Sequence, residues 1–398
     1  MTTGVNRATA GQALDVDDGE DTGCLGPYTI LDATQYLAGP FCTMILGALG
    51  ATVIKIEPPD SGDPSRHQPP FATADGLKWE RLDETDIGLA YLKRNVGKNS
   101  ISLDLKSEAD RVRLYQLVTE ADVFIHNFRP GVAGRLGVDP DRIQRENPRI
   151  VYCAIDGLGA YAVDGDARGV LDIVGQALSG LMAITGEEAG MPVRCGAPIG
   201  DEAAGLFAAV GILAALLGRD GKSGEGIGRR LTVSMVGSLA SLVWDEHIDV
   251  YKALGLPDRS GNGAYRNVPF NTYKATDGYV AIAAIGPREW QRLVAATGIP
   301  EFASHPEWSH MTYRVRDRAV IDGLLEAWVA TRSRHEVVDH LVAGGVTAAI
   351  VNSVADILDD ERYRSAYLYP VESNGRPTGA WAARLPISFS RRSAKLPL

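Results

Sequence analysis

A glycine-bearing stretch that follows a predicted strand is the first place where this chain could bind a ligand. Gly157, Gly159 and Ala162 fit a loose G-x-G-x-x-A pattern. In dinucleotide-binding proteins that pattern lets the backbone approach a pyrophosphate at a helix N-terminus. Here a polar stretch, residues 164–168, stands where the helix should begin with apolar residues. The sequence therefore favours a plain glycine-rich loop over a dinucleotide site.

Histidine and cysteine spacing offers no metal or hydrolase chemistry. The seven histidines include no H-x-x-x-H or H-E-x-x-H string, and no G-x-S-x-G string forms a nucleophile elbow. The four cysteines, Cys24, Cys42, Cys153 and Cys195, have no C-x-x-C spacing. This usage disfavours a zinc site and a disulfide framework, and it is typical of a reducing compartment. We expect no metal and a cytoplasmic protein.

Net charge and hydropathy limit the kinds of partner that we expect this chain to bind. The formal charge of −10 argues against nonspecific nucleic-acid binding, which requires a basic face, but it leaves room for a local basic pocket. No uninterrupted apolar run reaches the ~18 residues of a membrane span. The N-terminus lacks the apolar core of a signal peptide. We expect neither a nucleic acid nor a membrane among the partners.

The elements that would position a site alternate between strands and helices. Short apolar strands are predicted at residues 28–32, 52–56, 100–105, 123–126 and 149–155. Helices are predicted to start at Gly39-Pro40, at Ser107 with Asp110 as a capping partner, and at Asp139-Pro140. Successive strand–helix–strand units imply a parallel sheet. The sequence therefore predicts a doubly wound α/β domain.

The chain divides into a large and a small domain. We expect a disordered tail at 1–26, a discontinuous large α/β domain at 27–225 and 345–398, a small α+β domain at 245–335, and linkers at 226–244 and 336–344. A helix over 202–218 is apolar on most sides, which predicts that it is buried, with Asp201 at its N-cap.

Six strings occur in order along the chain, at residues 37–66, 95–107, 127–138, 147–159, 172–205 and 273–284. Together they resemble the class III CoA-transferase family, which includes formyl-CoA transferase, carnitine CoA-transferase and α-methylacyl-CoA racemase. The resemblance implies a Rossmann-like large domain built from both chain ends, with the small domain between them. It also implies an interlocked homodimer of threaded rings, with CoA mainly on the large domain and the active site at the subunit interface.

Three of these strings hold the positions that contact CoA in the family. The resemblance implies that CoA lies beside Leu37 and Ala38, near Leu103 and Lys106, and against Asn127, Phe128 and Arg135. The chemistry agrees, because an anionic nucleotide needs Lys or Arg charge and an adenine needs an apolar slot. Pro58 and Asp156 depart from the pattern, since some relatives have a basic CoA contact there.

The position of the family's nucleophile is occupied by a methyl group. In the transferases an aspartate in a T-G-x-x-D-G-x-P string attacks the acyl-CoA thioester and passes through anhydride and aspartyl-CoA intermediates. Here the string runs from Thr185 to Pro192 and holds Ala189 at that position, with Asp201 at the expected spacing beyond it. Three interpretations stay open: an engineered Asp-to-Ala change, a natural member with different chemistry, or substitution by the neighbouring Glu188.

Two other functions stay open besides CoA transfer. A racemase of the family would use Asp201 with a histidine, but Leu171 stands at the histidine position and Gly286 at that of its supporting glutamate. A noncatalytic acyl-CoA binder is the second alternative.

The loop 259–270, with Gly261 and Gly263, is predicted to be a mobile lid. The expected substrates are an acyl-CoA and a carboxylic acid acceptor, with no covalently bound cofactor.

Overall fold

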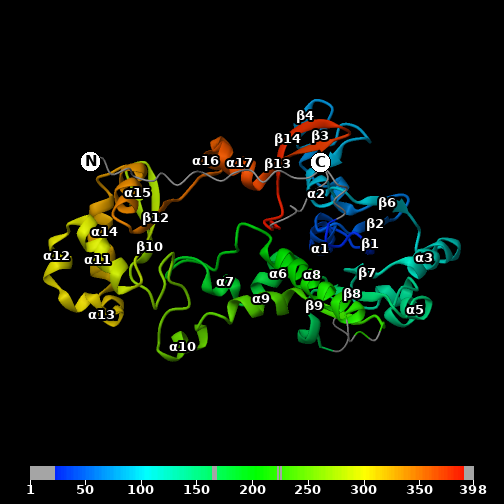
Figure 1. Cartoon of the computed structure of the whole chain (residues 1–398), viewed down its shortest axis with the longest axis horizontal. Helices are drawn as coiled ribbons and strands as arrows, with labels where there is room; N and C mark the ends of the chain where they lie inside the picture. Colours follow the sequence, from blue (N-terminus) through cyan, green and yellow to red (C-terminus); the bar gives the residue numbers. More distant parts are fainter. Residues whose placement is uncertain (1–22, 164–167, 222–223, 225, 390–398) are drawn as a thin grey trace, which may run out of the picture. The chain divides into compact units, whose positions relative to one another are not determined.

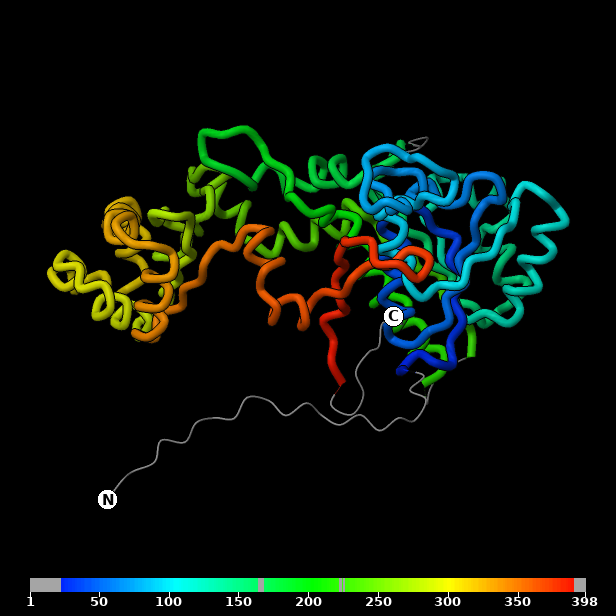
Figure 2. Tube along the Cα trace, turned by 90° about the horizontal axis from the view of Figure 1, so that it is seen from above, coloured from blue at the N-terminus to red at the C-terminus, as the bar shows by residue number. Residues whose placement is uncertain are grey.

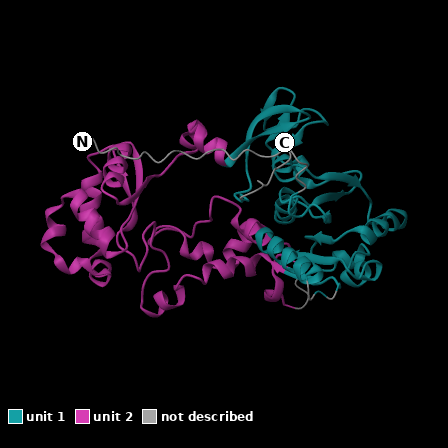
Figure 3. Ribbon diagram, viewed as in Figure 1, with its two compact units in different colours: residues 1–155, 205–232, 367–398 teal, residues 156–204, 233–366 magenta. Residues whose placement is uncertain are grey.

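The computed structural model describes residues 23–163, 168–221, 224 and 226–389. These residues fall into two compact units: unit 1 takes those within 1–155, 205–232 and 367–398, and unit 2 takes those within 156–204 and 233–366 (Figure 3). This grouping joins residues 156–204 to the small-domain segment, whereas the sequence placed them in the large domain. The functional domain boundaries stay a prediction.

Unit 1 is built on a six-stranded sheet (Figure 1). Its strands are β1 (Thr29–Ala33), β2 (Thr52–Glu57), β6 (Asn99–Ser102), β7 (Val123–His126), β8 (Val151–Asp156) and β9 (Arg230–Ser234), in the order β6-β2-β1-β7-β8-β9. The pairs β6–β2, β2–β1, β1–β7 and β7–β8 are all parallel. The predicted parallel α/β sheet is confirmed. Strand β9 lies in the segment that the sequence assigned to a linker.

Helices and a C-terminal hairpin complete unit 1. The helices are α1 (Ala38–Ala48), α2 (Leu89–Arg94), α3 (Glu108–Glu120), α4 (Val132–Arg135) and α5 (Pro140–Glu146), with the 3-10 turn η1 (Pro64–His67). The shorter strands are β3 (Phe71–Thr73), β4 (Gly76–Lys78), β5 (Ile87–Gly88), β13 (Leu368–Ser373) and β14 (Arg376–Ala383). The β13–β14 hairpin contacts α2 and β4, so residues from the two ends of the chain pack together (Figure 2).

Burial explains why the central strands β7 and β8 are largely apolar. Leu31, Phe124 and Tyr152 from three neighbouring strands pack with Leu114 of α3 and Ile143 of α5. Parallel strands covered by helices bury both faces, which favours such runs over alternation. The predicted tail at 1–26 lies mostly outside the described residues. Its last part belongs to the fold, because Leu25 is buried and its amide donates to the Leu49 carbonyl at 2.9 Å.

Two predicted helix caps have different outcomes. Asp139 caps α5 as expected, since its carboxylate accepts from the Arg142 amide at 3.0 Å. Ser107 stands at the N-cap of α3, but its side chain makes no capping bond there. The Asp110 carboxylate instead accepts from the Asp104 amide at 2.9 Å. The predicted capping box at Ser107 is therefore wrong, because its acidic member is engaged with the preceding turn.

The helix α8 (Ile199–Asp220) is longer than the sequence indicated. It starts at Ile199, so Asp201 lies within its first turn, and the predicted N-cap role of Asp201 is wrong. By length and composition alone α8 could cross a membrane, which the count of uninterrupted apolar residues did not show. About half of its apolar stretch is buried inside the protein.

Unit 2 contains an antiparallel sheet covered by helices. The sheet is formed by β10 (Phe270–Ala275), β11 (Gly278–Ala283) and β12 (Thr347–Ile350). Its helices are α6 (Asp172–Leu178), α7 (Leu181–Ile184), α9 (Met235–Val243), α10 (Ile248–Ala253), α11 (Pro287–Thr297), α12 (Pro300–Ser304), α13 (Met311–Arg316), α14 (Arg318–Val329), α15 (Arg334–Ala343), α16 (Val354–Asp359) and α17 (Glu361–Tyr367), with η2 (Gly159–Tyr161) and η3 (Pro306–Ser309). Trp290, Trp308, Leu325 and Leu341 centre its core. The capping box predicted at Ser333 and Glu336 is confirmed.

Candidate functional site

The sheet of unit 1 reverses its strand order between β1 and β7, which is where open parallel sheets bind ligands. The loops that follow these two strands are joined there by one side chain. Asn127 Oδ1 accepts from the Gln35 amide at 2.8 Å, and Asn127 Nδ2 donates to the Gln35 carbonyl at 2.7 Å. Asn127, predicted as a CoA contact, thus holds the two loops of this crevice together.

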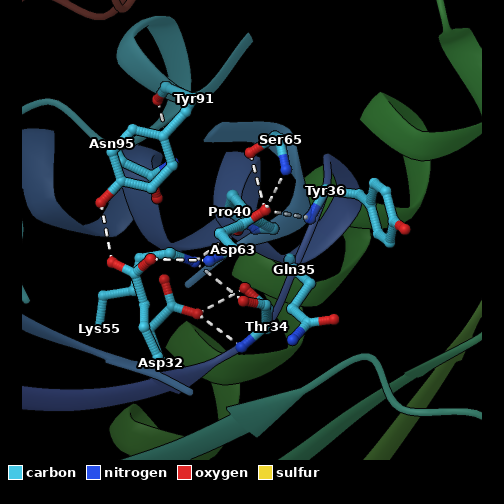
Figure 4. A network of polar contacts seen from close by, with 12 residues as sticks. Asp32, Thr34, Gln35, Tyr36, Pro40, Lys55, Asp63, Ser65, Tyr91 and Asn95 are labelled. Carbon is cyan, nitrogen blue, oxygen red and sulfur yellow. Dashed lines mark hydrogen bonds and ion pairs between the residues drawn. The ribbon is translucent and has the colours of Figure 1, made fainter. Parts of the chain in front are cut away.

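The turn between β1 and α1 rests on buried charged side chains (Figure 4). Lys55 Nζ donates to the Thr34 carbonyl at 2.9 Å and pairs with Asp63 at 2.9 Å. Asp63 in turn accepts from the Tyr36 amide at 3.2 Å. Both charged side chains are fully buried, so each depends on the other for its solvation. The pair therefore fixes the path of the turn.

A second buried pair supports the other end of the same turn. Lys98 Nζ donates to the Pro40 carbonyl at 2.9 Å and pairs with Asp32 at 3.1 Å. Burial lowers the pKa of Lys98 to about 8, against the opposing effect of Asp32. Burial also raises the pKa of Asp32, but Lys98, Lys55 and two hydroxyl groups outweigh it and hold that pKa below its ordinary range. The turn therefore lies on a cluster of buried, paired charges.

The turn itself exposes one aromatic side chain. Tyr36 has a left-handed backbone with φ +66°, which a bulky residue adopts only when its surroundings enforce it, and its side chain is exposed. Leu37 and Ala38, both predicted to lie beside CoA, have buried side chains. Contact with CoA at this turn would therefore be through their backbone. Nothing in the sequence pattern marks Tyr36.

Phe128, another predicted CoA contact, is positioned by a neutral histidine. The Phe128 amide donates to His126 Nδ1 at 3.1 Å, and the two rings stack with centroids 5.0 Å apart. His126 Nε2 lies 2.7 Å from the Tyr152 hydroxyl, whose proton goes to the Val138 carbonyl at 2.9 Å. Burial lowers the pKa of His126 to about 4. At neutral pH Nδ1 therefore accepts, and Nε2 carries the proton.

The remaining predicted CoA residues differ in exposure. Leu103 is buried in the core of unit 1, while Lys106 and Arg135 are exposed. The backbone of Lys106 is fixed by the Asp104 carboxylate at 2.9 Å, and Arg135 is the last residue of α4. The two cationic side chains are thus available on unit 1, and their contact with CoA stays a prediction.

In unit 2 the string that holds Ala189 forms a tight turn. The Gly190 amide donates to the Glu187 carbonyl at 2.9 Å, with Glu188 and Ala189 exposed at the apex. Arg259 donates to the carbonyls of Ala183 at 3.1 Å, Glu187 at 3.1 Å and Gly190 at 2.6 Å. The segment predicted as a lid is therefore bonded to the turn that contains Ala189.

Two further contacts join this segment to the turn. The Gly261 amide donates to the Gly186 carbonyl at 3.0 Å. Gly261 has φ +62°, and a side chain added there would meet the Glu187 carboxylate at 3.0 Å, whereas Gly263 has ordinary space around it. Burial, followed by the charge of Glu188, raises the pKa of Tyr265. Glu188 therefore lies close enough to act on the 259–270 segment.

The far end of the same loop is held by α6. Asp172 accepts from the Gly200 amide at 2.8 Å and from Gln176 Nε2 at 2.7 Å. The buried Gln176 accepts from the Cys195 amide at 2.8 Å. Asp172 thus satisfies the first turn of α8, the role that the sequence had given to Asp201. Sequence reasoning missed Arg259 and Gln176 as supports, because their partners are backbone groups far along the chain.

Within residues 23–163, 168–221, 224 and 226–389, no cluster of three or more His, Cys, Asp or Glu side chains could hold a metal ion. The predicted site residues gather at two places, the β1–β7 crevice of unit 1 and the turn at 187–190 of unit 2.

Comparison with known proteins identifies the family. The sequence profile of CoA-transferase family III matches residues 25–397. Succinyl-CoA:mesaconate CoA-transferase of Haloarcula hispanica is 35% identical over 85% of this chain and 83% of its own length. Formyl-CoA:oxalate CoA-transferase of Streptomyces avermitilis is 33% identical over the same shares. A CAIB/BAIF family protein from Brucella suis has a similar structure, with a TM-score of 0.77, 29% identity and 94% of each chain covered. The chain belongs to CoA-transferase family III, a family of transferases whose substrates are CoA thioesters.

Proposed function

We propose that this chain is a CoA-transferase framework that binds an acyl-CoA and a carboxylic acid, and that its transfer step requires a carboxylate at position 189. The observation that carries the proposal is the turn at Glu187–Gly190. Its carbonyls are held by Arg259 and its neighbour Gly186 by the Gly261 amide. None of these bonds involves the side chain at 189, so the geometry of the site does not depend on that side chain.

The covalent cycle explains why a methyl group stops it. A carboxylate attacks the thioester carbonyl and releases CoA thiolate, leaving a mixed anhydride. The thiolate then attacks the enzyme's acyl carbonyl, forms an enzyme thioester and releases the donor acid. The acceptor carboxylate repeats the two steps in reverse and leaves as a new CoA thioester. With Ala189 the first bond cannot form.

We also propose a homodimer. Leu206, Val210 and Leu217 are exposed along α8, with half or more of each side chain accessible. Monomeric soluble proteins rarely expose such a row of large apolar residues, and a partner subunit would cover it.

The test compares Ala189→Asp with Ala189→Asn, which has the same shape but no nucleophilic carboxylate. Succinyl-CoA and formyl-CoA serve as donors, and mesaconate, oxalate and malate as acceptors. We expect Ala189→Asp to raise transfer by roughly 10⁴-fold or more over both other forms. Mass spectrometry should find a hydroxylamine-sensitive CoA adduct on residue 189 of that variant alone.

A second candidate places the nucleophile at Glu188, whose charge acts on Tyr265 beside the turn. Full-rate transfer by the chain as it stands, abolished by Glu188→Gln, would establish this candidate and overturn the role of position 189. If Ala189→Asp binds acyl-CoA but transfers with no acceptor, the protein is a noncatalytic binder. The racemase alternative has less support, because Leu171 stands where a histidine would have to act together with Asp201.

A further inference from the structure

Arg259 makes an arrangement that a mobile lid residue would not make. Its Nε and both terminal nitrogens each donate to a different backbone carbonyl of the loop that holds Ala189. One of these carbonyls belongs to Ala183 in α7, and the other two belong to Glu187 and Gly190, the first and last residues of the turn. One planar group therefore bonds to the helix before the turn and to both sides of the turn.

The planar fork of a guanidinium makes this geometry directional. An ammonium group presents donors without a fixed plane, so a lysine could not hold three carbonyls of separate peptide groups in the same relative orientation. Because Glu187 and Gly190 flank the apex, fixing their carbonyls fixes the direction in which the Cβ of residue 189 points. All three acceptors are neutral carbonyls, so these bonds do not neutralise the positive charge of Arg259.

Arg259 is itself supported by Tyr265, which is in turn contacted by a residue of α14. Its carbonyl lies 2.8 Å from the Tyr265 hydroxyl, which also lies 2.9 Å from the Pro257 carbonyl. Arg318, at the start of α14, places its guanidinium 5.3 Å from the centre of the Tyr265 ring and donates to the Ala264 carbonyl. The support thus continues from α14 through Tyr265 to the turn.

We propose that Arg259 is a positioning residue that presets the orientation of residue 189 for attack on the thioester. The segment 259–270 then acts as a buttress of the reactive turn, whereas the sequence suggested a freely moving cover. This inference rests on the proposed function for its catalytic part, but its structural part can be tested in the chain as it stands.

The first experiment follows hydrogen–deuterium exchange over residues 183–192 of the full chain with Ala189 in place. Arg259→Ala should speed exchange of these amides about tenfold, with Arg259→Lys between the two. Arg266→Ala is the matched control: it lies in the same segment, but its guanidinium pairs with Glu246 at 3.1 Å. It should leave residues 183–192 unchanged. Equal exchange in Arg259→Ala and the parent would overturn the proposal.

The second experiment adds the same changes to the Ala189→Asp variant. Arg259→Ala should lower kcat roughly 10²-fold, because a small misplacement of a reacting group has that effect, and KM for the acyl-CoA should stay within about threefold. Arg259→Lys should recover part of kcat. An unchanged kcat, or a loss confined to KM, would overturn the positioning role. If Ala189→Asp alone is inactive, the proposed function fails, while the exchange result still decides the buttress.

Discussion

The turn after β1 in unit 1 and the turn at 187–190 in unit 2 are both shaped by cationic side chains that donate to backbone carbonyls. In the first, Lys55 and Lys98 are buried and each is paired with a buried aspartate. In the second, Arg259 is partly exposed and its guanidinium donates to three neutral carbonyls. The same kind of contact is thus made in two very different electrostatic surroundings.

This difference bears on what each turn tolerates. A buried charge that loses its partner is left without solvation, so single changes in the first cluster should be severe. At the second turn the side chain of residue 189 is exposed and takes no part in the supporting bonds. A change of residue 189 should therefore have little effect on the fold.

The largest effect expected from this comparison is on stability. Lys98→Met should lower the free energy of unfolding by about 3–5 kcal/mol, because Asp32 would stay buried without its cation. Lys252→Met removes a surface partner of Asp258 at the similar distance of 2.9 Å and should cost at most about 1 kcal/mol. Urea unfolding of the full chain measures both. Similar losses of stability in the two variants would show that burial does not make the Lys98–Asp32 pair more important for stability than the exposed Lys252–Asp258 pair.

The next effect concerns pH and sharpens the contrast within unit 1. The pKa of His126 is about 4 in the folded protein and is ordinarily near 6.5. Between these values the unfolded chain binds the extra proton, so stability is fully present above pH 6.5 and is lost as pH falls towards 4. The loss between pH 7 and pH 5 should be about 2 kcal/mol.

This window separates His126 from the perturbed carboxylates. Glu57, whose pKa is lowered to about 2, affects stability only below its ordinary pKa of 4.5. His126→Gln should flatten the slope between pH 5 and 6.5, while His335→Gln, a change at an exposed position, should leave it intact. A slope that persists in His126→Gln would contradict the assignment. The two unfolding curves can be measured by circular dichroism.

The sheet was predictable and the supports of the site were not, for a physical reason. Strands β7 and β8 are largely apolar because both of their faces are buried, and β1 and β2 are mainly apolar apart from charged residues such as Asp32 and Lys55. Arg259 instead bonds to peptide groups that lie 69 or more residues away, and Gln176 to one that lies 19 residues away. Because every residue type has a peptide group, such partners leave no pattern in the sequence. For the same reason the sequence did not reveal that Asp172, rather than Asp201, accepts from the first turn of α8.

The last prediction separates the two glycines that the sequence treated as equivalent hinges. Gly261 has a left-handed backbone and lies against the Glu187 carboxylate, so Gly261→Ala should lower stability by about 1–2 kcal/mol. Gly263 lacks both constraints, and Gly263→Ala should stay within about 0.5 kcal/mol of the parent. Thermal unfolding and exchange over residues 183–192 measure the pair. A hinge that works by backbone freedom would respond to both changes alike, whereas a buttress responds only where the segment contacts the turn. Equal effects of the two substitutions would therefore return the segment to the role of a lid.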